Sequence, residues 1–139
     1  MSAEFFIDTN VLVYSIDEND LKKQKIAQNL LEKLVKDESA VISTQTLQEF
    51  YNSVTRKCIC NKEKTSDFVT YFSNAFLVFN NTVSEIISAI KISIKTQFSF
   101  WDSLIIAAAK SSGCKTIYSE DLNDGQIVEG IKIENPFKQ

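Results

Sequence analysis

The sequence predicts an α/β fold with three layers, in which helices cover both faces of a central, mainly parallel sheet of four to five strands. Short apolar runs, each too short for a helix, alternate along the chain with longer segments whose apolar residues recur at helical spacing. This alternation is typical of parallel strands joined by crossover helices. The 139 residues, 44% of them hydrophobic, are enough for one core, and neither a linker nor a repeat interrupts them. We therefore expect a single domain over residues 1–139.

The first half of the chain reads as strand, helix, strand, helix. Residues 4–8 contain the short apolar run Phe5-Phe6-Ile7, end in an acid and predict a buried strand, after which Thr9 opens a helical turn. Asp20 is placed to cap an amphipathic helix with lysines and glutamates on its outer face. Residues 40–43 predict a second buried strand, and helical spacing resumes over about residues 46–57.

The second half continues the alternation and closes with turn-forming residues. Thr82 and Glu85 have the spacing of a capping box, which marks a helix start, and Gly113 is placed to end a later helix. The elements expected here are a helix over residues 62–76, a strand over 77–79, a helix from 82, a helix over 101–112, a strand over 115–119, a turn over 121–125 and a last edge strand over 130–134.

Composition excludes several classes of protein. A net charge of −3 argues against a module that binds nucleic acid by charge alone. The three cysteines lack the paired spacing of a zinc site, which favours free thiols. No apolar run reaches the roughly 20 residues of a membrane span, and the start lacks a secretory signal, so we expect a cytoplasmic protein that does not contact a membrane.

Four isolated acids are the candidate catalytic residues, in a chain that has no histidine. Asp8, Glu49, Asp102 and Asp121 each lie near the end of a predicted strand or the start of a predicted helix, and open α/β sheets bind ligands beyond the carboxyl ends of their strands. Two carboxylates about 4 Å apart repel by about 4 kcal/mol at an effective dielectric near 20, so such a cluster needs a cation. Oxygen ligands suit Mg²⁺ or Mn²⁺.

Each of these acids also has a purely structural interpretation. In chain order these are a helix cap at Asp8, a capping box between Thr46 and Glu49, a capping box between Ser99 and Asp102, and an Asx turn at Asp121. Four unrelated caps need not border one crevice, and their joint placement therefore favours a shared site.

Over essentially its whole length the chain resembles the PIN domain family, and within it the VapC-type toxins of toxin–antitoxin pairs. The resemblance rests on four ordered motifs: Ile7-Asp8-Thr9-Asn10, Leu47-Gln48-Glu49-Phe50, Trp101-Asp102-Ser103 and Ser119-Glu120-Asp121-Leu122. It implies a PIN-like α/β/α domain that hydrolyses RNA, with tRNA or another structured RNA as its target. It also implies a cognate antitoxin partner and a homodimer.

The resemblance also assigns roles to single residues. Asp8, Glu49, Asp102 and Asp121 would bind Mg²⁺ or Mn²⁺, with Asp124 as a further ligand through water. Thr9 and Ser119 would supply hydroxyls that hydrogen-bond these ligands. Asn10 would orient a ligand or contact substrate, although a local backbone hydrogen bond is the alternative that we favour. The bound metal would lower the pKa of a water molecule and offset charge on the phosphate.

Several alternatives are weighed against this interpretation. A catalytically silent RNA-binding or assembly module is disfavoured because all four acids are present. A receiver-like phosphoacceptor domain and a haloacid-type phosphatase are disfavoured because Thr9-Asn10 follows Asp8. A DNA nuclease is a further alternative within the enzyme class. The basic cluster of Arg56, Lys57, Lys62 and Lys64 is either a guide for RNA or a solvated helix end, and Phe68, Tyr71, Phe72 and Phe76 form either a core stripe or an apolar groove or dimer face.

Overall fold

The computed structural model describes residues 3–138 as alternating strands and helices. The elements are β1 (Phe5–Ile7), α1 (Thr9–Ile16), α2 (Leu21–Asp37), β2 (Ala40–Ser43), α3 (Thr44–Arg56), α4 (Lys62–Ala75), β3 (Leu77–Phe79), α5 (Val83–Lys95), α6 (Phe100–Ser111), β4 (Thr116–Tyr118), β5 (Ile127–Val128) and β6 (Ile131–Glu134). The mixed α/β class with a mainly parallel sheet is confirmed.

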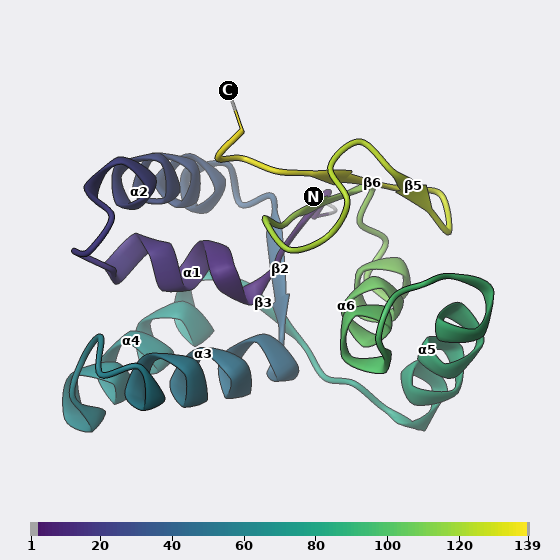
Figure 1. Ribbon diagram of the computed structural model, residues 1–139, viewed down its shortest axis with the longest axis horizontal. Helices are drawn as coiled ribbons and strands as arrows, with labels where there is room; N and C mark the ends of the chain where they lie inside the picture. The colour runs from purple at the N-terminus through teal and green to yellow at the C-terminus, as the bar shows by residue number, and fades with distance from the viewer. Residues whose placement is uncertain (1–2, 139) are drawn as a thin grey trace.

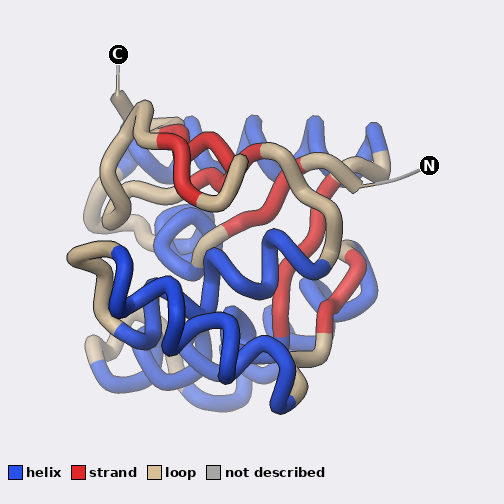
Figure 2. Tube along the Cα trace, turned by 90° about the vertical axis from the view of Figure 1, so that its right-hand side faces the viewer, coloured by secondary structure: helices blue, strands red, loops and turns tan. Residues whose placement is uncertain are grey.

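The strands form one six-stranded sheet in the order β3-β2-β1-β4-β6-β5. All neighbours pair in parallel except β5 and β6, which are antiparallel. The strands run side by side through the middle of the molecule (Figure 2). The sheet has one strand more than the four to five expected, because residues 127–128 add an antiparallel edge. The expected last edge strand is therefore wrong in one respect, since β6 lies inside the sheet between β4 and β5.

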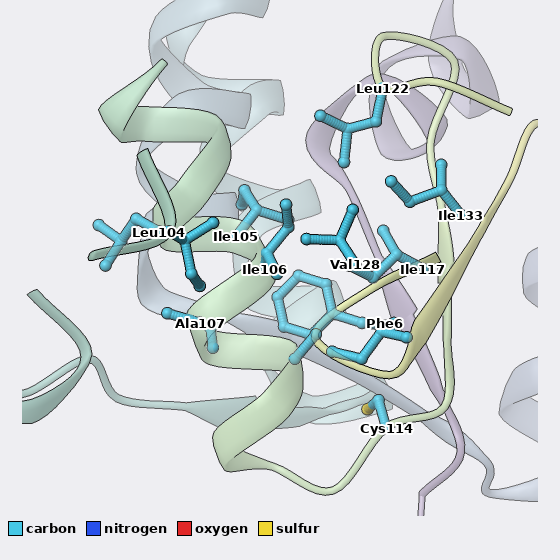
Figure 3. Close-up of a cluster of buried hydrophobic side chains, with 14 of the residues drawn as sticks. Phe6, Leu104, Ile105, Ile106, Ala107, Cys114, Ile117, Leu122, Val128 and Ile133 are labelled. Atoms are coloured by element: carbon cyan, nitrogen blue, oxygen red, sulfur yellow. The ribbon is translucent and has the colours of Figure 1, made fainter. Parts of the chain in front are cut away.

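Helices cover both faces of the sheet, as expected. Figure 1 shows α1 to α4 on one side and α5 with α6 on the other. Neighbouring residues of one strand face opposite layers: Phe6 and Ile117 pack toward α5 and α6, whereas Ile7 packs toward α1 to α4. Figure 3 shows the first of these two clusters, in which Phe6, Ile106, Ile117 and Ile133 meet.

Local signals set most of the element ends. The Asp20 side chain accepts a hydrogen bond from the Lys23 amide at the start of α2 (3.1 Å), as predicted. The Thr82 amide donates to Glu85 Oε1 (2.7 Å), which is the bond expected of a capping box. Gly113 follows α6 with a φ of +78°, a conformation in which a side chain would be strained.

Over residues 3–138 the helices are all too short or too polar to cross a bilayer.

Candidate active site

The loops after β1 and β4 meet where the order of the strands reverses. β1 lies between β2 and β4. The strands that follow it first in the chain, β2 and β3, lie on one side of it, and the later strands β4, β5 and β6 lie on the other. Ligands of open α/β sheets bind outside the carboxyl ends of the strands at such a reversal. A cavity of about 420 Å³ opens there, and its walls include Asp8, Glu49, Asp102 and Asp121. The structure thus brings the four acids from distant parts of the chain to one cavity.

Asp8 is the most buried of the four acids, with 6% of its surface exposed. It is the N-cap of α1, and its Oδ1 accepts from the Thr9 amide (2.8 Å). Asp8 therefore caps α1 and also lines the cavity. Burial raises the pKa of Asp8 to about 6; hydrogen bonds from Ser119 and Thr9 oppose the shift, and the nearby charges of Glu49 and Asp121 add to it.

Ser119 and Asn10 link Asp8 to the loop that carries Asp121. The Ser119 hydroxyl donates to Asp8 Oδ2 (2.7 Å) and accepts from the backbone amide of Asp121 (3.2 Å). The Asn10 amide nitrogen lies within hydrogen-bonding distance of Asp8 Oδ2 (3.3 Å) and Asp121 Oδ2 (3.2 Å), and its Oδ1 accepts from the Glu120 amide (3.0 Å). The local backbone hydrogen bond that we favoured for Asn10 is wrong: among the described residues, its side chain contacts the Asp8 side chain and the loop that carries Glu120 and Asp121.

Glu49 lies in the second turn of α3 and has a donor on each carboxylate oxygen. Thr9 Oγ1 donates to Oε1 (2.8 Å), and Gln45 Nε2 donates to Oε2 (3.2 Å). The capping box predicted for Thr46 and Glu49 is wrong: the helix begins two residues earlier, where Ser43 and Thr46 cap each other. This shift leaves the Glu49 side chain free to reach the cavity.

Asp102 and Asp121 complete the acidic wall. Asp102 lies in the first turn of α6, where its backbone amide donates to the Ser99 hydroxyl (3.1 Å). Burial raises the pKa of Asp102, and the charge of Asp121 adds to the shift. The Asp121 side chain is exposed and, among the described residues, accepts from the Asn10 side chain but from no backbone amide. The Asx turn considered for Asp121 is therefore not formed.

The four acids give the cavity a concentration of negative charge. Within residues 3–138, the ion pairs involve none of the four acids. The same part of the chain contains no group of three or more acidic or cysteine side chains close enough to hold a metal ion. The four acids fit Mg²⁺ or Mn²⁺ as ligands, because these cations prefer oxygen ligands and because the negative carboxylates attract a positive ion. Mg²⁺ usually keeps several water ligands and needs only one or two protein carboxylates.

Asp124 does not join the other acids. It borders a separate hollow, where its carboxylate accepts from the Asn135 amide (2.8 Å) and pairs with Lys138 (3.4 Å). The Asn135 bond lowers the pKa of Asp124, and Lys138 contributes. The role of Asp124 as a metal ligand through water stays a prediction. Of the basic cluster, Arg56 and Lys57 line the cavity of the four acids, whereas Lys64 borders a different groove.

Some residues of the site were not expected from the sequence. Gln45 contacts Glu49, and their spacing of four residues on one helix was an available signal. Glu120 lines the cavity beside Asp121 and accepts from Tyr14 Oη (2.9 Å) while it pairs with Lys23. These contacts join residues about 100 positions apart, and local patterns do not predict them.

Comparisons with known proteins agree with this geometry. The model of the PIN domain family matches residues 5–124. A search of curated protein sequences finds no match. Similar solved structures include a DNA-bound VapBC complex from Salmonella typhimurium (19% identity, TM-score 0.73, covering 96% of this chain and 98% of that chain). Another is VapBC2 from Rickettsia felis bound to a promoter DNA fragment (18%, 0.72, 94% and 97%). A third is Mycobacterium tuberculosis VapC20, described as a sarcin–ricin loop cleaving toxin (17%, 0.68, 85% and 90%). These likenesses establish a shared fold, and the family match covers most of the sequence. The chain belongs to the PIN domain family.

Proposed function

We propose that this protein is a metal-dependent endoribonuclease and the toxin of a toxin–antitoxin pair that acts in the cytoplasm. The observation that carries the proposal is the convergence of Asp8, Glu49, Asp102 and Asp121 on one cavity at the strand reversal of a PIN domain. The substrate would be RNA, with tRNA or another structured RNA as the target class.

The four acids would hold Mg²⁺ or Mn²⁺. A divalent cation bound there would lower the pKa of a water molecule and offset the negative charge that develops on the phosphate. Thr9, Ser119 and Gln45 would orient the carboxylates, because each donates a hydrogen bond to Asp8 or Glu49.

Positive charge at one rim of the same cavity supports a phosphate-bearing substrate. Arg56 and Lys57 are both exposed and line the cavity at the end of α3. Neither forms an ion pair with a described residue, so both side chains are available to an RNA backbone. One of the carboxylates of the cavity would orient the attacking water.

The experiment that tests the nuclease is cleavage of RNA by the purified protein, freed of any antitoxin. Cleavage should require Mg²⁺ or Mn²⁺ and stop when EDTA is added. Asp8→Asn and Asp102→Asn should each remove it while circular dichroism shows a folded protein. Asp124→Asn is the matched control, since Asp124 borders a separate hollow, and it should cleave normally. Cleavage that survives in both cavity variants would defeat the assignment, and a folded, inactive wild type would favour a silent binding module.

The antitoxin would bind in an apolar groove of about 650 Å³. Its walls come from α1, α2 and α4 and include Leu31, Val35, Phe68, Tyr71 and Phe72. Tyr71 is 56% exposed, whereas Phe72 is 4% exposed, so the aromatic stripe of α4 serves both the core and the groove. The groove suits the apolar face of a helix. Among the similar structures, those from Salmonella typhimurium and Rickettsia felis are VapBC complexes, which supports a protein partner.

A neighbouring reading frame that encodes a small DNA-binding protein would supply the partner to test. Its product should inhibit cleavage, and Tyr71→Lys should weaken inhibition without changing cleavage itself. Leu21→Lys is the control, because Leu21 is also exposed, at 68%, but does not line the groove. Equal inhibition of both variants would place the partner elsewhere.

A homodimer is part of the same proposal, and the outer face of α5 is its expected interface. Five apolar residues are exposed on this one helix: Val83, Ile86, Ile87, Ile90 and Ile94. Their exposed fractions lie between 42% and 78%. An exposed apolar stripe of this kind is typical of a contact between proteins.

A further inference from the structure

Two acids of the cavity, Glu49 and Asp102, come from helices on opposite faces of the sheet. Asp8 caps α1 and Glu49 lies in α3, on the face covered by α1 to α4, whereas Asp102 lies in α6 on the other face (Figure 1). α3 and α6 pack into two different hydrophobic clusters, one on each side of the sheet. The two helices therefore share the sheet but no hydrophobic cluster.

One buried side chain bridges the two layers beside the cavity. Gln45, in the first turn of α3 and 4% exposed, donates from Nε2 to Glu49 Oε2 (3.2 Å) and to the backbone carbonyl of Trp101 (3.1 Å). Trp101 immediately precedes Asp102 in α6. Among the side-chain hydrogen bonds of residues 3–138, the bond from Gln45 to Trp101 alone joins helices α1 to α4 directly to α5 or α6.

The amide nitrogen accounts for both side-chain contacts of Gln45. Its two hydrogen bonds among the described residues are both donated by Nε2, to Glu49 and to Trp101. An apolar side chain of the same length would fill the same buried space without these bonds. The amide nitrogen therefore ties the Glu49 carboxylate to the start of α6.

We propose that Gln45 is a positioning residue that holds Glu49 against the start of α6 and thereby sets the separation of Glu49 and Asp102. The inference rests on the proposed nuclease function for its meaning, and on the two hydrogen bonds of the amide for its geometry. Mg²⁺ requires nearly ideal ligand positions, so loosening two of its ligands should weaken binding. Groups that orient metal ligands typically change metal affinity by about 10- to 100-fold when they are removed.

The test compares Gln45→Met with Gln48→Met in the full chain. Methionine keeps the length of glutamine and removes the donor. Gln48 lies in the same helix, is exposed and makes no side-chain hydrogen bond among the described residues, which makes it a matched control. Isothermal titration with Mg²⁺ should show a dissociation constant about 10- to 100-fold higher for Gln45→Met and an unchanged one for Gln48→Met. Cleavage by Gln45→Met should recover at high Mg²⁺. Gln45→Leu removes the same donor if Gln45→Met does not fold.

A second readout needs no metal. Hydrogen exchange in EDTA should be faster at the first-turn amides of α6 in Gln45→Met than in Gln48→Met, while the urea midpoints of the two variants stay similar. If Gln45→Met binds Mg²⁺ as tightly as the control, the inference is overturned. If the wild type neither binds Mg²⁺ nor cleaves RNA, the proposed function fails, and the exchange rates then decide alone. Equal rates at α6 would overturn the positioning role, and faster rates in Gln45→Met would support it.

Discussion

Replacing Asp8 with asparagine should stabilise the metal-free protein at pH 8, although it removes a residue of the proposed active site. Burial raises the pKa of Asp8 from 3.8 to about 6. A rise of about two in the pKa means that the folded protein favours the protonated carboxyl over the charged one by about 3 kcal/mol more than the unfolded chain does. The folded state binds this proton more tightly than the unfolded state. The resulting stabilisation is complete below about pH 4 and is lost as the pH rises through about 6, the folded pKa.

Asparagine is neutral, so at high pH it avoids the cost of burying the charged Asp8 carboxylate. It also loses a hydrogen bond that the Asp8 carboxylate accepts. The two oxygens of Asp8 accept from the Thr9 amide and from the Ser119 hydroxyl, and a carboxamide offers an oxygen on one side only. One lost bond costs about 1 kcal/mol. The net expectation is a gain of about 1 to 2 kcal/mol at pH 8, which disappears or reverses at pH 4.5.

Urea unfolding in EDTA at both pH values measures this difference, and comparing variants at each pH cancels the titration of other groups. Asp20→Asn changes the N-cap of α2 in the same way, away from the cavity, and controls for capping. Added Mg²⁺ should stabilise the wild type more than Asp8→Asn, because a ligand of the folded state raises its stability. If Asp8→Asn were destabilised equally at pH 4.5 and pH 8, the reasoning from burial would be refuted.

Three further outcomes are expected. Ser119→Ala removes the donor to Asp8 and should move the carboxyl pKa above about 6, which a carbon-13 titration of Asp8 by NMR can follow; an unchanged pKa would contradict the assigned hydrogen bond. Gly113→Ala should lower the free energy of unfolding by about 1 to 2 kcal/mol, because φ is +78° and an added Cβ meets nothing within 4 Å, so that only backbone strain remains; urea unfolding that matches the wild type would rule this out. Ile90→Lys combined with Ile94→Lys should shift the protein toward monomer in sedimentation equilibrium, and a wild type that is already monomeric would exclude α5 as a self-association surface.

The order of strands and helices could be predicted because the signals are local. Asp20, Thr82 and Gly113 act within a few residues of themselves, and the structure has each of them at a helix end. The start of α3 was misplaced because two overlapping capping patterns compete there, and the end of β2 at Ser43 decides between them. The two-residue strand β5 gave no periodic signal, since its pairing depends on β6.

The residues that line the site were predictable, but their contacts were not. An acid at the end of a strand points to the edge of the sheet where ligands bind. Four acids in such places predict a shared cavity, which the structure contains. Asn10 reaches the Glu120 amide 110 residues away, and Gln45 reaches Trp101 56 residues away. Such pairs depend on the order of strands in the sheet and on the two layers of helices. No periodicity within one segment encodes them.

The hydrogen bonds of the cavity have a consequence for any cation that binds there. Thr9, Asn10, Gln45 and Ser119 all present neutral donors to the acids, and within residues 3–138 no lysine or arginine pairs with those acids. Neutral donors orient carboxylates without cancelling their charge. Burial raises the pKa of Asp8, and the charges of Glu49 and Asp121 add to the shift. A divalent cation would therefore displace weak neutral contacts rather than a competing positive charge. Metal affinity should therefore depend on each donor that fixes the positions of the acids.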